Sequence, residues 1–365
     1  MIYFQVKRSK NDSFLDQKNM SNITTISTTT SASAAAEAQL VILYNLMIQN
    51  LSRVFDCFIW ILGHIGAICV CIVFSQPVFR KSPCAMYFIA SSISQIVLFN
   101  FAVFIRLIQY GYDVPVNSLD AWFCRIRYYL FYASGAIARY NIIFAGADRF
   151  LCSSRITRLR QCSSPKIALR VIIINAIFWI IFYIQVLVNF SVSGDKCRIT
   201  TDEFRRYFNL FFLIENGIFP IFPMAIFGLL TIRNIRQSSE RAKAGADGSV
   251  DGSQSVTNTN TGGHKKETQL HRMLINQIIV FIVLTIPSPV YSIYRTYFLN
   301  TSTLSGSGAL MDTFLNNLFF DCIYLNYALT CLTFLFTSAM FRRELKQVIQ
   351  KIIFCRHRQH ISPIT

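Results

Sequence analysis

The sequence predicts an all-α membrane protein, a bundle of seven transmembrane helices with a short amphipathic eighth helix. Of its 365 residues, 53% are apolar and only 15% are charged, which sets the chain apart from ordinary soluble domains. Seven apolar segments follow one another, and each can cross a hydrocarbon core of about 30 Å. Lys and Arg gather in alternate connecting segments, as the positive-inside tendency of multi-pass proteins requires.

The bundle is expected to occupy residues 54–337. Residues 1–53 are polar and rich in Ser, Thr and Ala, so we expect a disordered extracellular tail. Residues 237–264 contain no apolar run, which indicates a flexible cytoplasmic loop. The expected spans lie near residues 54–75, 85–109, 122–150, 167–190, 207–233, 269–297 and 313–337.

Residues 338–365 are predicted to form an amphipathic helix and a cytoplasmic tail. Between Phe341 and Ile353, basic and apolar residues alternate at helical spacing, which is typical of a helix lying along a membrane surface. Cys355 at its end is a candidate for palmitoylation, with a free thiol as the alternative.

Two independent patterns orient the chain. Lys and Arg concentrate after the first, third and fifth spans and in the tail, which places those segments in the cytoplasm. All the N-x-S/T sequons, which are candidate glycosylation sites, fall on the opposite side. The N-terminus is therefore expected outside and the C-terminus inside. These sequons include Asn11, Asn22, Asn50, Asn189 and Asn300.

The cysteines predict one disulfide. Of the eleven cysteines, only Cys124 and Cys197 lie clearly on the outer, oxidising side. A bond between them would tie the loop after the fourth span to the outer end of the third. The alternative is two unpaired outer thiols.

The third span is the centre of the prediction. Read as one helix from Cys124 to Phe150, it is about 40 Å long at ~1.5 Å per residue, which exceeds the membrane core. Its inner end carries Asp148, Arg149 and Phe150. An arginine at a membrane boundary is held by an adjacent carboxylate, and an acid on a neighbouring helix can hold it further.

These residues resemble the rhodopsin-like (class A) G-protein-coupled receptors, over roughly residues 54–345. The triplet matches the family's D-R-Y/F/W, and Cys124 precedes Arg149 by the family's spacing of 25 positions. Trp179 in the fourth span and Phe281-x-x-x-Thr285-x-Pro287 in the sixth add to the resemblance.

The resemblance implies a switch. Glu267 stands where the family carries an acid that holds Arg149 in the inactive state; the alternative is a solvated glutamate. Pro287 kinks its helix and provides a hinge. In the family, agonist binding lets the inner half of the sixth helix swing outward and opens a cavity for the G-protein α-subunit.

The chain also departs from the family. Gly66-Ala67 replaces a Gly-Asn pair, and Gln95 stands where the second span usually has an aspartate. A neutral amide cannot neutralise a buried cation, so we expect no allosteric sodium site. Thr285 replaces the usual tryptophan, and residues 330–334 replace Asn-Pro-x-x-Tyr, so the activation relay is unconventional.

The ligand pocket is expected among charged and aromatic residues of the outer halves. Phe131 stands where amine receptors carry an aspartate, and the seventh span has no lysine for a retinal Schiff base. Arg139, the deepest cation, needs an anion, which Glu215 or Asp321 can supply; the pair is then either internal or part of the ligand site. The candidates are Arg106, Arg125, Arg127, Tyr128, Phe131, Tyr132, Glu215, Tyr291, Arg295 and Asp321.

The resulting interpretation is a plasma-membrane receptor that binds an extracellular ligand, which we expect to be a peptide, and activates a heterotrimeric G protein. The sequence looks most like invertebrate neuropeptide (FMRFamide-type) receptors, partly through FGLLTIRNIR at residues 227–236. The formal charge of +17 lies in short groups between apolar runs, which favours contacts with membrane lipids over nucleic acid. No enzymatic motif, metal site or cofactor is expected.

Two alternatives stay open at this stage. A transporter or channel would use Arg139, Asp321 and Arg106 along a polar pathway. A receptor-shaped protein that no longer couples to a G protein would account for the altered seventh-span motif.

Overall fold

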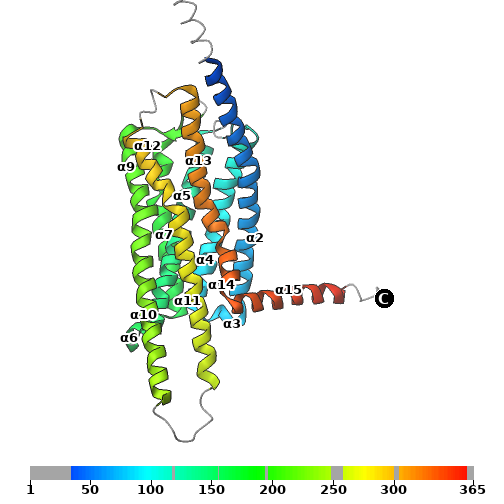
Figure 1. Ribbon diagram of the computed structural model, residues 1–365, viewed down its shortest axis with the longest axis vertical. Coiled ribbons are helices and arrows are strands. Elements are labelled where there is room, and N and C mark those ends of the chain that lie inside the picture. Colours follow the sequence, from blue (N-terminus) through cyan, green and yellow to red (C-terminus); the bar gives the residue numbers. More distant parts are fainter. Residues whose placement is uncertain are drawn as a thin grey trace, which may run out of the picture.

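Seven long helical spans run side by side in the described part of the chain, in the computed structural model shown in Figure 1. The structure describes residues 34–116, 120–154, 156–193, 196–247, 258–299 and 304–359. Five helices in these ranges are long and apolar enough to cross a membrane, and a pair bent by 45° at Leu329 makes a sixth span. The remaining span, α5 (Ala121–Ser153), is less apolar because it contains Arg139, Asn141 and several tyrosines. It packs against neighbouring helices. The predicted all-α bundle is confirmed.

Several spans are built from consecutive helical pieces. The first is helical over Ala34–Phe74 and includes the π-helical turn η1 (Leu51–Asp56) and α2 (Cys57–Phe74). The second span consists of α4 (Pro83–Leu98), η2 (Phe99–Phe104) and η3 (Leu107–Gly111), the third is α5, and the fourth consists of α7 (Pro165–Phe182) and α8 (Ile184–Asn189). The fifth consists of α9 (Asp202–Phe212), η4 (Leu213–Ile218) and α10 (Phe219–Asp247). The sixth consists of α11 (Asn258–Thr285) and α12 (Pro287–Tyr297), and the seventh of α13 (Gly306–Ala328) and α14 (Thr330–Thr337). Short helices α3 (Pro77–Arg80) and α6 (Thr157–Cys162) lie in the inner loops.

The first helix begins earlier than predicted. We expected a disordered tail up to residue 53, which is wrong for residues 34–53, because they are helical. The apolar run from Leu40 to Ile48 explains the difference, since Ile48 is buried against the bundle. Glu37 also accepts hydrogen bonds from the backbone N–H and the hydroxyl of Ser307, both at 2.8 Å. Residues 1–33 lie outside the described residues.

The predicted flexible loop at residues 237–264 is shorter than expected. Helix α10 continues to Asp247 and α11 begins at Asn258, and both extend beyond the lower end of the bundle in Figure 1. The reason is composition, because Glu, Arg, Lys and Ala between residues 237 and 247 are good helix formers. Residues 248–257 lie outside the described residues.

The outward surface of the bundle is apolar. On α2, Ile61, Ile65, Ile68 and Ile72 recur at intervals of three and four residues and are 39–58% exposed. Water would penalise such a stripe, whereas lipid tails accept it. The exposed face of the bundle therefore fits a hydrocarbon environment.

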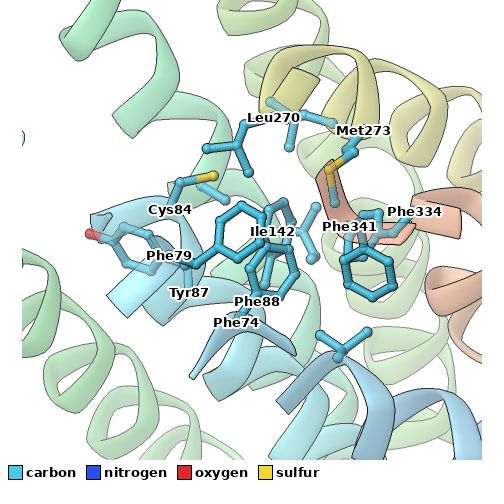
Figure 2. Packing of buried hydrophobic residues seen from close by; sticks show 14 of the residues in the cluster. Phe74, Phe79, Cys84, Tyr87, Phe88, Ile142, Leu270, Met273, Phe334 and Phe341 are labelled. Carbon is cyan, nitrogen blue, oxygen red and sulfur yellow. The ribbon is translucent and has the colours of Figure 1, made fainter. Parts of the chain in front are cut away.

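The inner half of the bundle is packed by aromatic rings (Figure 2). Phe334 of α14 lies 4.8 Å from Phe88 of α4 and 5.9 Å from Phe341, measured between ring centroids. Phe74 of α2 lies within 5.8 Å of each of these three rings. Phe334 stands where the family carries the tyrosine of its seventh-span motif, and here this ring is an apolar anchor with no exposed surface.

The predicted eighth helix is present as α15 (Ala339–Gln359). In Figure 1 it runs sideways, away from the lower end of the bundle. Ser338 starts it, since its hydroxyl accepts a hydrogen bond from the Phe341 backbone N–H at 3.1 Å. Phe341 is fully buried, whereas Ile349 and Ile353 are 47% and 61% exposed.

The outer end carries the predicted disulfide. Strands β1 (Phe190–Ser193) and β2 (Lys196–Ile199) pair antiparallel, with Val192 opposite Cys197. Cys197 is bonded to Cys124 at the outer end of α5, with Cα atoms 5.7 Å apart. The hairpin therefore covers the outer mouth of the bundle beside α5.

Candidate functional site

A buried ion pair lies at the inner end of α5. Arg149 Nη2 donates to Asp148 Oδ2 over 2.6 Å, and both side chains are 5% exposed. Ser163, in the loop before α7, donates its hydroxyl to Asp148 Oδ1 over 2.6 Å. Phe150 stacks on Phe227 of α10 with ring centroids 5.9 Å apart. Asp148 thus connects Arg149 to the inner loop.

The sixth span is divided at the predicted hinge. Helix α11 ends at Thr285 and α12 begins at Pro287, which has no N–H for the helical ladder. Phe281, one turn before the break, is 3% exposed. Glu267 lies in α11, but its side chain is outside the described residues, so its contact with Arg149 stays a prediction.

Two glutamines of α11 hold the sixth span to the seventh span and α15. Gln277 donates to Thr330 Oγ1 at 3.3 Å and accepts from Thr333 Oγ1 at 3.0 Å. Two turns closer to the cytoplasm, Gln269 Oε1 accepts from the hydroxyl of Ser338 at 3.0 Å and from the Met340 backbone N–H at 2.8 Å. We call these two residues the amide latch.

A second ion pair lies deep in the bundle. Arg139 of α5 donates to Glu215 Oε1 over 2.6 Å and also to the side-chain oxygen of Asn216. Tyr183 donates its hydroxyl to the other oxygen of Glu215 at 3.2 Å. Of the two anions that the sequence offered for Arg139, the structure selects Glu215.

A π-helical turn positions both partners of Arg139. Glu215 and Asn216 are consecutive residues of η4, and both are buried. The wider turn of a π-helix brings neighbouring positions toward one face, and such turns are frequent at functional sites. The fifth span can therefore direct two adjacent polar side chains at one arginine.

Two small cavities lie on either side of this ion pair. The outer one, of about 20 Å³, is lined by residues that include Phe131, Tyr132 and Asn216. The inner one, of about 10 Å³, is lined by residues that include Gln95, Gln277 and Phe281. Arg139 and Tyr327 line both. A cavity needs about 10–15 Å³ to hold one water molecule, so each of these cavities has room for about one water beside Arg139.

A third ion pair joins the outer parts of the second and seventh spans. Arg106 Nη2 lies 2.7 Å from Asp321 Oδ1 and 3.2 Å from the carbonyl oxygen of Asn317. Asp56 of η1 is fully buried beside this pair and acts electrostatically on both residues. The cluster therefore links the first, second and seventh spans through charge.

Aromatic side chains surround the outer part of α5. Tyr128 and Tyr132 stack with ring centroids 6.2 Å apart, and Phe131 lies 4.5 Å from Tyr132. The guanidinium of Arg127 lies 5.2 Å from the Tyr128 ring and donates to Gln109 Oε1 at 3.2 Å. Four of the predicted pocket residues are therefore neighbours.

Other predicted pocket residues lie at the outer rim. Tyr291 of α12 donates its hydroxyl to Asp312 Oδ1 at 3.0 Å, and Arg295 Nη2 lies 2.8 Å from Asp312 Oδ2. Arg125 donates to the Phe190 carbonyl at 3.0 Å and lies 5.4 Å from the Trp122 ring. The candidate pocket is thus divided among separate clusters at different depths.

A family model described as "7 transmembrane receptor (rhodopsin family)" matches residues 66–341. The chain belongs to the rhodopsin family of seven-transmembrane receptors. No curated protein matches it. The matched residues run from within α2 to the start of α15, so they contain most of the bundle, the disulfide and the three ion pairs.

Membership of the family gives the receptor its broad role. It is a multi-pass plasma-membrane receptor for signalling. Members of the family are receptors rather than enzymes, and the family implies an extracellular ligand and a G protein as partners. The outer hairpin and the inner Arg149 then lie at the two ends between which a signal passes.

Sequence reasoning missed several residues of the receptor's polar network. Asp56 is an acid in an apolar segment, and that alone marks it as unusual. Gln277 and Gln269 give a weaker signal, because amides are common in helices. Ser163 gives no distinctive signal, since a serine in a basic loop is ordinary.

The predicted modification sites of the receptor are only partly described. Asn50 is exposed on the first helix. Asn189 is partly buried, and its side chain donates to the Gln185 carbonyl at 2.9 Å. Asn11, Asn22, Asn300 and the side chain of Cys355 lie outside the described residues.

Proposed function

We propose that this receptor binds an extracellular peptide and, in response, promotes nucleotide exchange on a heterotrimeric G protein through outward movement of the sixth helix. The observation that carries the proposal is the buried Asp148–Arg149 pair at the inner end of α5. A buried guanidinium held by one carboxylate can be released to another partner, as a two-state switch requires.

The outer rim supports a peptide ligand. Trp122, Tyr297 and Phe298 are 61%, 53% and 77% exposed, and the side chain of Arg295 on α12 is 41% exposed. Tryptophan, tyrosine and arginine are the residues that most often dominate the energetics of peptide and protein interfaces. The cavities beside Arg139 are too small for a buried ligand of that size. From the sequence resemblance, we propose that the ligand is a neuropeptide of the FMRFamide type.

The contacts of α11 support the proposed movement. Its inner half is held to α14 and α15 by the neutral hydrogen bonds of the amide latch. Such bonds contribute about 1 kcal/mol each, so ligand binding can supply the energy to break them. The break at Pro287 gives the segment a place to bend.

A G-protein dissociation assay against a neuropeptide library tests the proposal. Membranes with the unmodified receptor should respond to at least one peptide. Arg149→Ala should lose the response while surface expression is retained. Because the substitution lies at the inner end, peptide binding to Arg149→Ala should stay within about threefold of the unmodified receptor, which is less than 1 kcal/mol.

Three results would contradict the proposal. One is a peptide response that persists in Arg149→Ala. Another is ligand-independent movement of ions or solutes through the protein, which favours a transporter or channel. The third is saturable peptide binding without G-protein dissociation for any α-subunit, which favours a non-coupling receptor.

A further inference from the structure

We propose that Ser163 is a phosphorylation site for a basophilic protein kinase and that its phosphate releases Asp148 from the inner loop and loosens the hold on Arg149. The modification is independent of the proposed function, whereas its effect on signalling rests on it. The proposal starts from a contact that joins a loop hydroxyl directly to the switch.

The contact places Ser163 within the charge network of Arg149. The hydroxyl of Ser163 donates to Asp148 Oδ1 at 2.6 Å, and Asp148 Oδ2 accepts from Arg149 at 2.6 Å. The carboxylate is 5% exposed, so these contacts replace water around it. Asp148 therefore depends on Ser163 for one of its hydrogen bonds.

The residues before Ser163 fit the substrate groove of a basophilic kinase. Arg158 and Arg160 lie five and three positions before it, and both are exposed. Kinases with acidic substrate grooves select arginine at such positions, because guanidinium–carboxylate contacts are strong and directional. Since Lys and Arg mark this loop as cytoplasmic, it faces the compartment that contains ATP and kinases.

The local fold allows the segment to enter a kinase. Helix α6 (Thr157–Cys162) has no buried residue, and Cys162 beside Ser163 is exposed. A helical turn without buried apolar contacts opens at low cost. Ser163 itself is only partly buried, so a brief opening of α6 exposes its hydroxyl.

The reaction is an ordinary phosphoryl transfer with ATP as donor. The oxygen of Ser163 forms a bond to the γ-phosphorus, the bond from that phosphorus to the bridging oxygen of ADP breaks, and the hydroxyl proton passes to the kinase's catalytic base. The product replaces a neutral donor with a group of about −2 charge that can only accept hydrogen bonds at neutral pH.

Phosphorylation turns an attractive contact with Asp148 into a repulsive one. A hydroxyl that donates to the carboxylate becomes a dianion that repels it, so the phosphate must move away from Asp148. The exposed Arg158 and Arg160 provide cationic partners in the loop. Asp148 then still accepts from Arg149 but has lost the hydrogen bond from Ser163, so the inactive arrangement is weakened.

The test begins with the modification itself. Membranes containing the full-length receptor are incubated with ATP and the catalytic subunit of a basophilic kinase, and the site is mapped by tandem mass spectrometry. Phosphate is expected on Ser163, and Arg160→Ala should lower its yield about tenfold through loss of a charged contact. Phosphate on the adjacent Ser164 alone, or no phosphate while a control peptide is labelled, would overturn the proposal.

The consequence is measured in two ways on the same membranes. Amide hydrogen exchange over residues 144–154 should rise after phosphorylation, whether or not the receptor couples. Basal nucleotide exchange should also rise, by about fivefold for each hydrogen bond lost by the carboxylate. An unchanged hydrogen exchange with Ser163 fully phosphorylated would refute the release of Asp148.

Matched variants separate modification from folding. Arg160→Ala keeps the Ser163–Asp148 contact, so it should have normal basal exchange and a response to the kinase that is reduced with the phosphate yield. Ser163→Ala removes the donor and should raise basal exchange without further effect of the kinase. Cys162→Ala, an exposed neighbour, should behave as the unmodified receptor. Nucleotide exchange can also be absent from every sample while phosphorylation of the unmodified receptor still changes its hydrogen exchange. In that case the G-protein proposal is wrong and the Ser163 proposal stands.

Discussion

Three of the buried arginines in the described part of the bundle each have an acidic partner, at a different depth. Arg106 contacts Asp321 in the outer half, Arg139 contacts Glu215 in the middle, and Arg149 contacts Asp148 at the inner end. A single charge left in this environment is costly, whereas an apolar pair of similar volume can be neutral. Each of the two deeper pairs is therefore a matched set, in which the loss of one member is worse than the loss of both. The outer pair differs, because the buried Asp56 also acts on Arg106.

The pair in the middle tests this argument. Arg139→Leu should strongly reduce the amount of folded receptor, because Glu215 is left buried without its cation at a cost of about 3–5 kcal/mol. Arg139→Leu combined with Glu215→Leu should recover most of the expression. The measurement is thermal stability of the solubilised receptor together with surface expression.

Arg205→Ala provides the control, since its ion pair with Asp202 is exposed and should contribute at most about 1 kcal/mol. A double variant that is less stable than Arg139→Leu alone would show that the pair is not matched in this way.

The sequence predicted part of this residue-scale arrangement. A cation as deep as Arg139 requires an anion, and Glu215 was one of two possible partners. The choice depends on η4, because the π-helical turn sets which of its side chains face α5. The pattern of apolar residues does not reveal a single extra residue in a turn, so Asp321 could not be excluded in advance. Asp321 instead pairs with Arg106.

At the scale of helices, the inner half of the sixth span is held by polar contacts rather than by apolar packing alone. Gln277 and Gln269 lie two turns apart on α11 and reach α14 and the start of α15. These bonds are made in the arrangement seen here and break if α11 swings outward. Their loss should therefore favour the outward arrangement.

Substitution of the amide latch measures this bias. Gln277→Leu should raise ligand-independent nucleotide exchange about fivefold per hydrogen bond lost, and Gln269→Ala should act in the same direction. Gln76→Leu is the matched control, because Gln76 lies in the turn between α2 and α3 and its side chain donates to the carbonyl of Ile72, four residues earlier. Basal exchange that is equal in all three variants would argue against a latch.

The sequence predicted the elements better than their ends. Hydrophobic runs locate the spans, but the first, fifth and sixth helices continue into polar sequence beyond the membrane. Residues 237–247 contain good helix formers that extend a helix already nucleated in the bundle. The amide contacts were also not predictable, because they depend on how α11 is rotated about its axis.

At the scale of the whole molecule, one covalent bond ties the outer loop to the central helix. The Cys124–Cys197 bond closes a loop across 73 positions of sequence and fixes the β1–β2 hairpin beside α5. Constraining a long loop stabilises the folded state mainly by restricting the unfolded one. The sequence predicted this bond from compartment alone, without knowledge of the hairpin.

Cys124→Ser and Cys197→Ser should each lower the stability of the solubilised receptor by about 2–5 kcal/mol. The double variant should be no less stable than either single one, because all three lack the same bond. Cys162→Ser, at an exposed free thiol, should change little. Thermal unfolding in detergent gives the comparison, and additive losses in the double variant would contradict a shared bond.

The contact between Glu37 and Ser307 joins positions 270 apart in sequence. It supplies an anion at the amino end of α13, where the helix dipole is positive and the first backbone N–H groups need acceptors. Residues 34–50 thus contribute to the structure of the outer end of the bundle. A shortened receptor that starts at Val54 would lose this acceptor and leave Ser305 as the side-chain cap of the seventh helix. Trimming the chain for expression should therefore stop before Ala34.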